Sequence, residues 1–144
     1  MLHRLLRLWH RWIDAEPPAL VGRNLARVDL GGANLECADL RRADMAGANL
    51  VGSNLTRADL READLSGAYL SWARLRGADL RGAHLRGADL EGADLREADL
   101  RGALLENARL QDARLGDARL SRGRLQEASL SPEQRKAARV EENE

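Results

Sequence analysis

Leucine recurs at every fifth position through most of this chain. Between Leu20 and Leu130 this register has 23 positions, of which 22 hold leucine and one holds Met45. Alanine stands two places before the leucine at 18 of the 20 such positions from 33 to 128, the exceptions being Ser53 and Gly123. The residue between alanine and leucine is most often Asp or Asn. The repeating unit is therefore A-[D/N]-L-x-x, and any fold must accommodate a period of five.

A period of five fits neither regular secondary structure. Along an α-helix, steps of five would scatter the leucines around the whole circumference. Along a straight strand, an odd step would turn alternate leucines toward water. The chain buries every leucine only if it changes direction once per repeat, with Ala and Leu pointing inward and the polar residue between them pointing outward. We therefore expect a coil with corners.

The glycines indicate where the corners lie. Ten of the 13 glycines occupy the second position after the repeat leucine. Glycine adopts the positive φ that the third residue of a type II turn requires, so this spacing favours a turn between successive repeats. Coils of this kind can stack with parallel-strand hydrogen bonds at a spacing of about 4.8 Å, which satisfies the polar groups of the backbone.

With this signature, the segment from Leu25 to Leu130 resembles the pentapeptide-repeat family. The resemblance implies an all-β solenoid, a right-handed quadrilateral parallel β-helix with four pentapeptides per coil, so that residues twenty apart stack. We expect about five coils within residues 17–130, after an N-terminal α-helical cap in residues 1–16 and before a short C-terminal helix and tail in residues 131–144. The inward leucines form the structural core, which includes Leu40, Leu60, Leu80 and Leu100.

Stacking by twenty predicts columns of charge on the surface. One side gains an acidic column and an adjacent basic column, made of Asp39, Asp59, Asp79 and Asp99 and of Arg41, Arg61, Arg81 and Arg101. Like charges one coil apart repel, so each column needs the other as its counter-column. The same map predicts three inter-coil ion pairs: Asp89 with Arg109, Asp94 with Arg114 and Asp99 with Arg119. Exposed pairs of this kind each stabilise a fold by about 0 to 1 kcal/mol.

The charge balance bears on function. The chain has 23 basic and 23 acidic side chains, and a net charge of zero argues against direct nucleic-acid binding. The family resemblance implies a second possibility, because some members protect DNA gyrase as acidic mimics of duplex DNA. Residues 25–130 hold 16 Arg and 17 Asp or Glu, a net charge of about −1. A DNA mimic needs an acidic stripe that its own arginines do not neutralise, so binding to a topoisomerase is the alternative function.

The outward positions offer three candidate protein-binding residues. Tyr69 and Trp72 flank one leucine among small residues, and exposed aromatic side chains are enriched at interaction hot spots. The competing interpretation places the Trp72 ring flat over neighbouring glycines. Leu104 is the third candidate, because it stands where the repeat has Asp.

No outward cluster predicts catalysis or metal binding. His84 stacks above Asp64 and Asp44, but a surface histidine beside a carboxylate does not make a zinc site, and we predict no metal and no cofactor. Ser66 and Ser71 lack a convincing histidine and acid partner. The glycines follow the corner positions rather than a phosphate-binding loop. We therefore predict no enzymatic activity.

The N-terminal segment has the pattern of an amphipathic helix. Residues 2–13 place apolar side chains at helical spacing opposite basic ones. A stacked coil leaves its first layer open, so we expect this helix to cap the rod through Leu5, Leu6, Trp9 and Ile13. The alternative is binding to a membrane surface or to the groove of a partner.

The C-terminal segment begins with a helix-start signal. Ser131 is an N-cap residue, Pro132 suits the first helical position, and Gln134 completes a capping box. These residues predict a short helix toward Val140. Its apolar face is thin, so the last coil would be incompletely covered, and we infer a possible homodimer through the C-terminal ends.

The leading function is therefore a non-enzymatic scaffold, a rigid rod that presents fixed columns of side chains to an unknown protein partner. No apolar run reaches the ~18 residues that cross a bilayer, and arginines interrupt the N-terminal apolar residues, so we expect a cytoplasmic protein. Arg occurs 22 times and Lys once, which suggests a bacterial source with a GC-rich genome.

Overall fold

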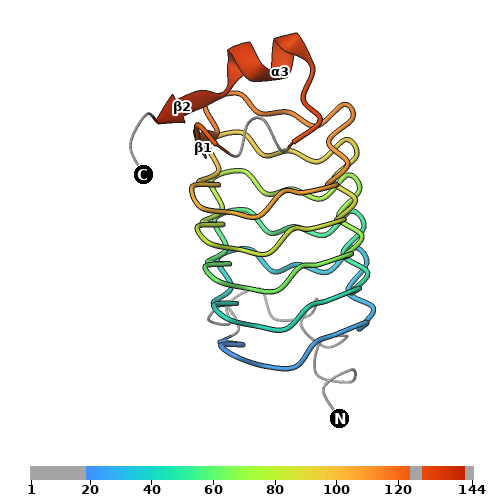
Figure 1. Cartoon of the computed structure of the whole chain (residues 1–144). Coiled ribbons are helices and arrows are strands. Elements are labelled where there is room, and N and C mark those ends of the chain that lie inside the picture. Colours follow the sequence, from blue (N-terminus) through green and yellow to red (C-terminus); the bar gives the residue numbers. More distant parts are fainter. Residues whose placement is uncertain (1–18, 124–127, 142–144) are drawn as a thin grey trace.

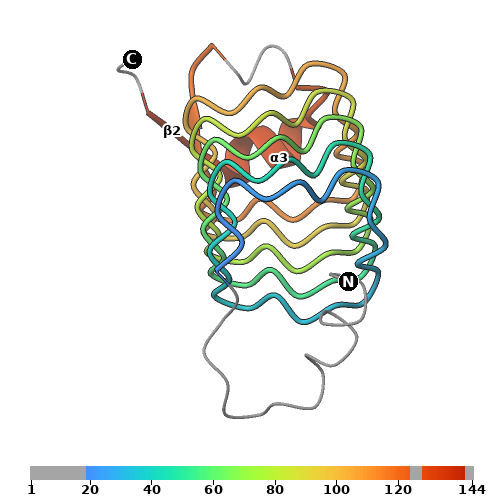
Figure 2. The ribbon, with the colours of Figure 1, turned by 90° about the horizontal axis from the view of Figure 1, so that it is seen from below.

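The computed structural model is a stack of similar coils, and it describes residues 19–123 and 128–141. In Figure 1 the coils follow one another along a single axis, from the blue end of the described chain to the red end. Figure 2 shows the same coils from below. The predicted N-terminal cap, with Leu5, Leu6, Trp9 and Ile13, lies outside the described residues.

Parallel bridges join each coil to the next with a constant register of twenty residues. The first bridge pairs Ala19 with Asp39 and the last isolated bridge pairs Asp99 with Arg119. The backbone follows the same register, since the amide of Leu20 donates to the carbonyl of Asp39 at 2.7 Å. One coil therefore contains four pentapeptides and has four sides. We number the sides by their inward residues: the first carries Leu40 and Leu60, and the second carries Met45 and Leu65. The third side carries Leu50 and Leu70, and the fourth carries Leu55 and Leu75.

Leucine and alanine fill the interior of the stack. Every residue of the leucine register from 20 to 120 is at most 8% exposed, and Leu40, Leu60, Leu80 and Leu100 are at most 1% exposed. Because the alanines are equally buried, each repeat contributes one large and one small apolar side chain to the core. Ser53 replaces one of these alanines and is the one buried polar residue in the described core.

The corners have the geometry of type II turns. At each corner from 22 to 117 the third residue of the turn has positive φ, and the fourth residue donates back to the first, as the amide of Arg23 does to the carbonyl of Leu20 at 3.1 Å. Ten of these corner residues are glycine, and ten are larger, including Trp72 with φ 60°. The corners are therefore set by the inward packing of Leu and Ala rather than by glycine alone.

The C-terminal end adds one further layer. The strand β1 (Arg119–Ser121) pairs in parallel with β2 (Arg139–Glu141) in the same register of twenty. The helix α3 (Pro132–Ala137) connects toward β2 and lies across the end of the stack in Figure 1. The Gln134 side-chain amide donates to the carbonyls of Leu110 and Ala113 at 2.7 and 3.0 Å, so α3 is fastened to the last coil.

The helix α3 starts as the sequence predicts and ends earlier. The Ser131 side chain accepts from the amide of Gln134, and the Gln134 side chain accepts from the amide of Ser131, which forms the capping box. The predicted continuation toward Val140 is wrong, because the chain leaves the helix after Ala137 and forms β2. The amide of Arg139 donates to the carbonyl of Ala118 at 2.7 Å. It therefore pairs with the coil below and does not donate within a longer helix.

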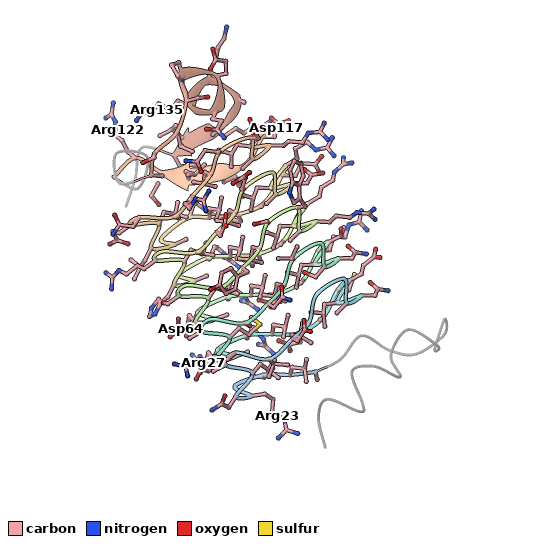
Figure 3. The ribbon with its side chains drawn as sticks, turned by 90° about the vertical axis from the view of Figure 1, so that its right-hand side faces the viewer. Arg23, Arg27, Asp64, Asp117, Arg122 and Arg135 are labelled. Atoms are coloured by element: carbon pink, nitrogen blue, oxygen red, sulfur yellow. The ribbon has the colours of Figure 1, made fainter. Side chains whose placement is uncertain are left out.

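The ends of the described rod are marked in Figure 3 by Arg23 at one end and Arg135 on α3 at the other. Among the described residues there is no helix with the length and apolar character to span a bilayer. The described residues also contain no group of three or more His, Cys, Asp or Glu side chains placed to share a metal ion.

Candidate interaction surface

The first side carries a regular ladder of Asp and Arg. In each of four successive coils the Asp carboxylate accepts the backbone amide of the Arg two residues later and also binds its guanidinium through two oxygens. For Asp59 and Arg61 these distances are 3.2 Å to the amide, 2.9 Å to Nε and 2.6 Å to Nη2. The other three pairs are Asp39 with Arg41, Asp79 with Arg81 and Asp99 with Arg101. We call this surface the Asp/Arg ladder.

Adjacent coils of the ladder are also linked. The Nε of Arg61 lies 3.6 Å from Asp79 of the next coil, and Arg41 lies 3.7 Å from Asp59. The hydrogen bond from Arg61 holds the pKa of Asp59 below its usual value, although partial burial opposes the shift. At the C-terminal end the ladder continues to Glu141, which Arg101 approaches at 3.2 Å and thereby ties β2 to the coil. The acidic column is thus neutralised along its length.

The three predicted inter-coil pairs, two on the third and fourth sides and one within the ladder, differ in their geometry. Asp89 and Arg109 lie 3.2 Å apart. Asp99 and Arg119 are 3.9 Å apart, because Arg101 of the same coil holds the carboxylate.

The predicted ion pair between Asp94 and Arg114 is not formed, because Asp94 bonds Arg96 of its own coil, at 2.7 Å from Nε. This bond is the main cause that lowers the pKa of Asp94, and Arg114 contributes only through its field. An Arg two residues after an Asp stands in the following turn, where its backbone amide and its guanidinium both reach the carboxylate, so the pair within a coil prevails here over the pair between coils.

The third side has a different character, because it lacks charge where Tyr69 and Trp72 stand. No charged residue occurs in residues 45–56 or in residues 65–73. These two segments stack on each other, with Asn49 bridged to Tyr69, and Asn54 is bridged to Arg74 directly after the second segment. We call their outward surface on the third side and its corner with the fourth the Trp72 patch, which comprises Asn49, Val51, Gly52, Asn54, Tyr69, Ser71 and Trp72.

The patch is apolar, aromatic and accessible. Trp72 is 63% exposed, Tyr69 is 55% exposed and Val51 is 41% exposed. Val51 lies one coil below Ser71, and Gly52 lies one coil below Trp72, so the groups below the two rings are small or apolar, whereas Asp89 and Glu91 lie one coil above Tyr69 and Ser71. In a chain with 32% charged residues, a charge-free aromatic surface has the composition of an interface core.

The Trp72 ring is held against the next coil. Its amide donates to the carbonyl of Glu91 at 2.9 Å, and its ring covers the corner at Gly92 so closely that a β-carbon there would lie 2.5 Å from the ring carbon Cε3. The ring thus lies over a glycine gap as the competing interpretation stated, yet most of its surface stays exposed. Trp72 is fixed in direction and available for contact.

The polar background of the patch is also fixed. The Asn49 side chain donates to the Asp29 carboxylate at 2.9 Å, and the Asn54 side chain donates to Asn34 at 3.2 Å. Their Oδ1 atoms accept backbone amides two residues later, at 3.1 Å for Val51. Because these side chains are already ordered, this chain would lose little conformational entropy on binding a partner.

The third predicted candidate, Leu104, and the stack of His84 on Asp64 lie apart from the patch. Leu104 is half-buried on the second side, where it bridges His84, and therefore does not join Tyr69 and Trp72. His84 does stack on Asp64, but the pKa of Asp64 is lowered mainly by its hydrogen bond with Ser66 and only secondarily by His84. Sequence reasoning missed Val51, although the absence of charge from residues 45–56 was a readable signal.

Comparison with known proteins places the chain in a family. The family model described as pentapeptide repeats matches residues 24–62, 63–102 and 98–131, with eight copies. The chain belongs to the pentapeptide repeat family. Proteins of this family form right-handed quadrilateral β-helices, and the comparisons indicate no catalytic family. A search of curated proteins found no match.

Two solved pentapeptide repeat proteins have similar folds. One, from the cyanobacterium Cyanothece 51142, is 32% identical, with 71% of this chain and 86% of that chain covered and a TM-score of 0.53. The other, from the thylakoid lumen of Arabidopsis thaliana, is 29% identical, with 81% and 74% covered and a TM-score of 0.56. The fold thus occurs in a cyanobacterium and in a plant thylakoid lumen. The bacterial source and the cytoplasmic location of this chain therefore stay predictions.

Proposed function

We propose that this pentapeptide repeat protein is a non-enzymatic scaffold that binds a protein partner through the Trp72 patch. The observation that carries the proposal is a surface of seven uncharged residues with two exposed aromatic rings, on a rod whose other outward positions are rich in charge. Contact residues of interfaces are enriched in Trp and Tyr and depleted of Lys, Glu and Asp, and the patch has this composition.

The backbone at Trp72 supports the same function. A bulky residue with positive φ is strained, and half of the corners in this rod avoid that strain with glycine. Trp72 also requires a glycine at position 92 to make room for its ring. Nine other corners of the described coils also hold a larger residue at positive φ, so the feature particular to Trp72 is its exposed ring packed over Gly92, and this ring is better explained by recognition than by the turn.

A capture experiment with matched variants tests this function. Trp72→Gly removes the ring and relieves the backbone, so it should leave the coil intact. Asp112→Gly is the control, because Asp112 occupies the same corner two coils away, is exposed and also has positive φ. Full-length tagged chains are used as baits in extracts of the source organism. We expect at least one protein that the wild type and Asp112→Gly retain and that Trp72→Gly retains tenfold less.

Equal retention by all three baits would contradict the proposal. A protein identified in this way is then purified and titrated against the same three chains, so that the difference is measured on a binary complex. Circular dichroism of each variant establishes that the coil is intact before binding is compared.

The alternative, imitation of DNA for binding to gyrase, has less physical support. The acidic column of the first side is paired with arginines within and between coils, so it does not present the continuous negative stripe of a duplex. A gyrase supercoiling assay with a quinolone separates the two functions. We expect no effect of the chain on supercoiling, and protection or inhibition would favour the alternative.

A further inference from the structure

Two arginines beside the Trp72 patch make no ion pair. Arg74 stands two residues after Trp72 at the centre of the fourth side, and Arg57 stands at the far corner of that side. Both are exposed, and neither guanidinium bonds any carboxylate in residues 19–123 or 128–141. In the Asp/Arg ladder, by contrast, a carboxylate of the same coil binds each arginine, that is Arg41, Arg61, Arg81 and Arg101.

The stacking explains why Arg74 has no counter-ion. The residue above it is Asp94, whose two oxygens are taken by Arg96. The residue below it is Asn54, which is neutral and donates to Asn34 and to the Glu36 carboxylate, at 3.2 Å in each case. Arg74 therefore lies between a neutralised acid and an amide, with its charge directed to solvent.

Arg57 is placed by its contact with the next coil. Its Cγ lies 3.6 Å from the point where a β-carbon would stand at Gly77, so its stem runs up the corner toward the coil that carries Arg74. The residue below it in the stack is Cys37, which carries no charge to pair with it, and the amide of Cys37 donates to the carbonyl of Thr56. The fourth side thus carries two cations without a carboxylate partner among the described residues, beside a patch whose bordering carboxylates on the next coil, Asp89 and Glu91, are bonded by Arg109.

We propose that the Trp72 patch binds an acidic protein segment, which places an apolar or aromatic side chain on Trp72 and Tyr69 and its carboxylates against Arg74 and Arg57. This inference rests on the proposed function and names the chemistry of the partner. The aromatic contact supplies buried area, and the two cations supply charge complementarity without breaking any ion pair of the rod. A basic segment would meet Arg74 and Arg57 as like charges.

A peptide-selection experiment tests the chemistry of the partner. A phage-displayed library of random linear peptides is panned on the immobilised full-length chain. We expect enriched peptides to combine an aromatic or aliphatic residue with flanking Asp or Glu. One enriched peptide is then synthesised and titrated against the wild type, Arg74→Gln, Arg114→Gln and Trp72→Gly.

Arg114→Gln is the matched control, because Arg114 is exposed at the same position of the same side, two coils above Arg74. We expect the dissociation constant to rise severalfold for Arg74→Gln and tenfold or more for Trp72→Gly, and to be unchanged for Arg114→Gln. Added salt should weaken the wild-type complex, because exposed charge pairs are screened.

The outcomes separate the two levels of the proposal. Enriched peptides without acidic residues, no enrichment over background, or equal effects of Arg74→Gln and Arg114→Gln would overturn the acidic-segment proposal. If non-acidic peptides still lose affinity for Trp72→Gly, the patch remains an interaction surface and only the partner class is wrong. If enriched peptides bind Trp72→Gly as tightly as the wild type, the proposed function is contradicted as well.

Discussion

The first and third sides of the rod share one interior and differ outside. Behind the Asp/Arg ladder lies Leu60, and behind the Trp72 patch lies Leu70, and both are fully buried. Outside, the ladder repeats the same ion pair coil after coil, whereas the patch interrupts the repeat with aromatic, small and uncharged residues. The core does not require this difference.

The contrast indicates which surface is explained by folding. The ladder stabilises its own turns, since each Asp accepts the amide of the Arg two residues later and neutralises its charge. The patch shares this turn bond at Asn49, but its Trp72 ring leaves no room for a β-carbon at Gly92 and so constrains the next coil. A surface that the fold maintains at a cost is a better candidate for recognition than one that the fold needs.

The largest effects should come from the interior and be alike on the two sides. Leu60→Ala and Leu70→Ala should each lower the free energy of unfolding by about 2 to 5 kcal/mol, through lost burial and the cavity that remains. Urea denaturation followed by circular dichroism measures both. A loss at one position and none at the other would break the premise that the sides share one core.

Substitutions at the corners should have the next largest effect on stability, and this effect should differ between Gly52 and Gly92. Gly52 and Gly92 have the same positive φ and lie one coil below and one coil above Trp72, but a β-carbon at Gly52 meets nothing within 4 Å. Gly52→Ala should therefore cost about 1 to 2 kcal/mol from the backbone alone. Gly92→Ala should cost more, because the Trp72 ring must move.

The additional loss of stability caused by Gly92→Ala should disappear when Trp72 has already been replaced by glycine. A double-mutant cycle of Gly92→Ala with Trp72→Gly, measured by urea denaturation, isolates this coupling. Equal costs of Gly92→Ala in the two backgrounds would contradict the contact between the ring and the corner.

Behind the patch, Ser53 should lower stability. Its hydroxyl is fully buried and makes no hydrogen bond, where other repeats have alanine. Ser53→Ala should raise the free energy of unfolding by about 1 kcal/mol. The reciprocal change, Ala73→Ser one coil above, should lower it by a similar amount. Thermal unfolding checks both, and a loss of stability in Ser53→Ala would show that the hydroxyl is satisfied.

The smallest effect should come from the ladder and should depend on pH. Asp59→Asn removes the ion pair to Arg61, while Asn can still accept the amide two residues later, as Asn49 does. The pKa of Asp59 is lowered in the fold, chiefly by its hydrogen bond with Arg61, so its contribution is present above its ordinary pKa of about 4 and is lost as the pH falls through the lower folded value.

The unfolding temperatures of the wild type and Asp59→Asn should therefore differ slightly at pH 7 and converge in acid. A gap that widens as the pH falls would contradict this assignment. Because the ladder lies on the opposite side from the patch, Asp59→Asn should leave partner binding unchanged.

Much of this structure is readable from the sequence, because its period is strict. The period of five places Leu80 and its counterparts inside, and the capping box at Ser131 marks the start of α3. The resemblance adds the register of twenty. Distances between side chains are less readable: Asp94 has an Arg at both two and twenty residues along, and only the geometry of the turn favours Arg96.

The end of α3 and the extent of the patch could not be predicted from the sequence, and the physical reason is the same for both. Nothing within residues 132–140 stops the helix at Ala137, since the competing bond comes from Ala118 of the coil below. Val51 and Arg57 join the surface near Trp72 only through stacking. The side-chain directions depend on neighbours twenty residues away, which local patterns do not encode.

The most direct measurement compares the two opposite sides of a single coil. Ser71 on the patch and Arg81 on the ladder occupy equivalent outward positions, ten residues or half a coil apart. A photo-crosslinking amino acid is placed at each in turn, and crosslinks are collected in the source organism. We expect a partner protein to be captured from position 71 and not from position 81. Capture from position 81 with none from position 71 would contradict the assignment of the Trp72 patch as the binding surface.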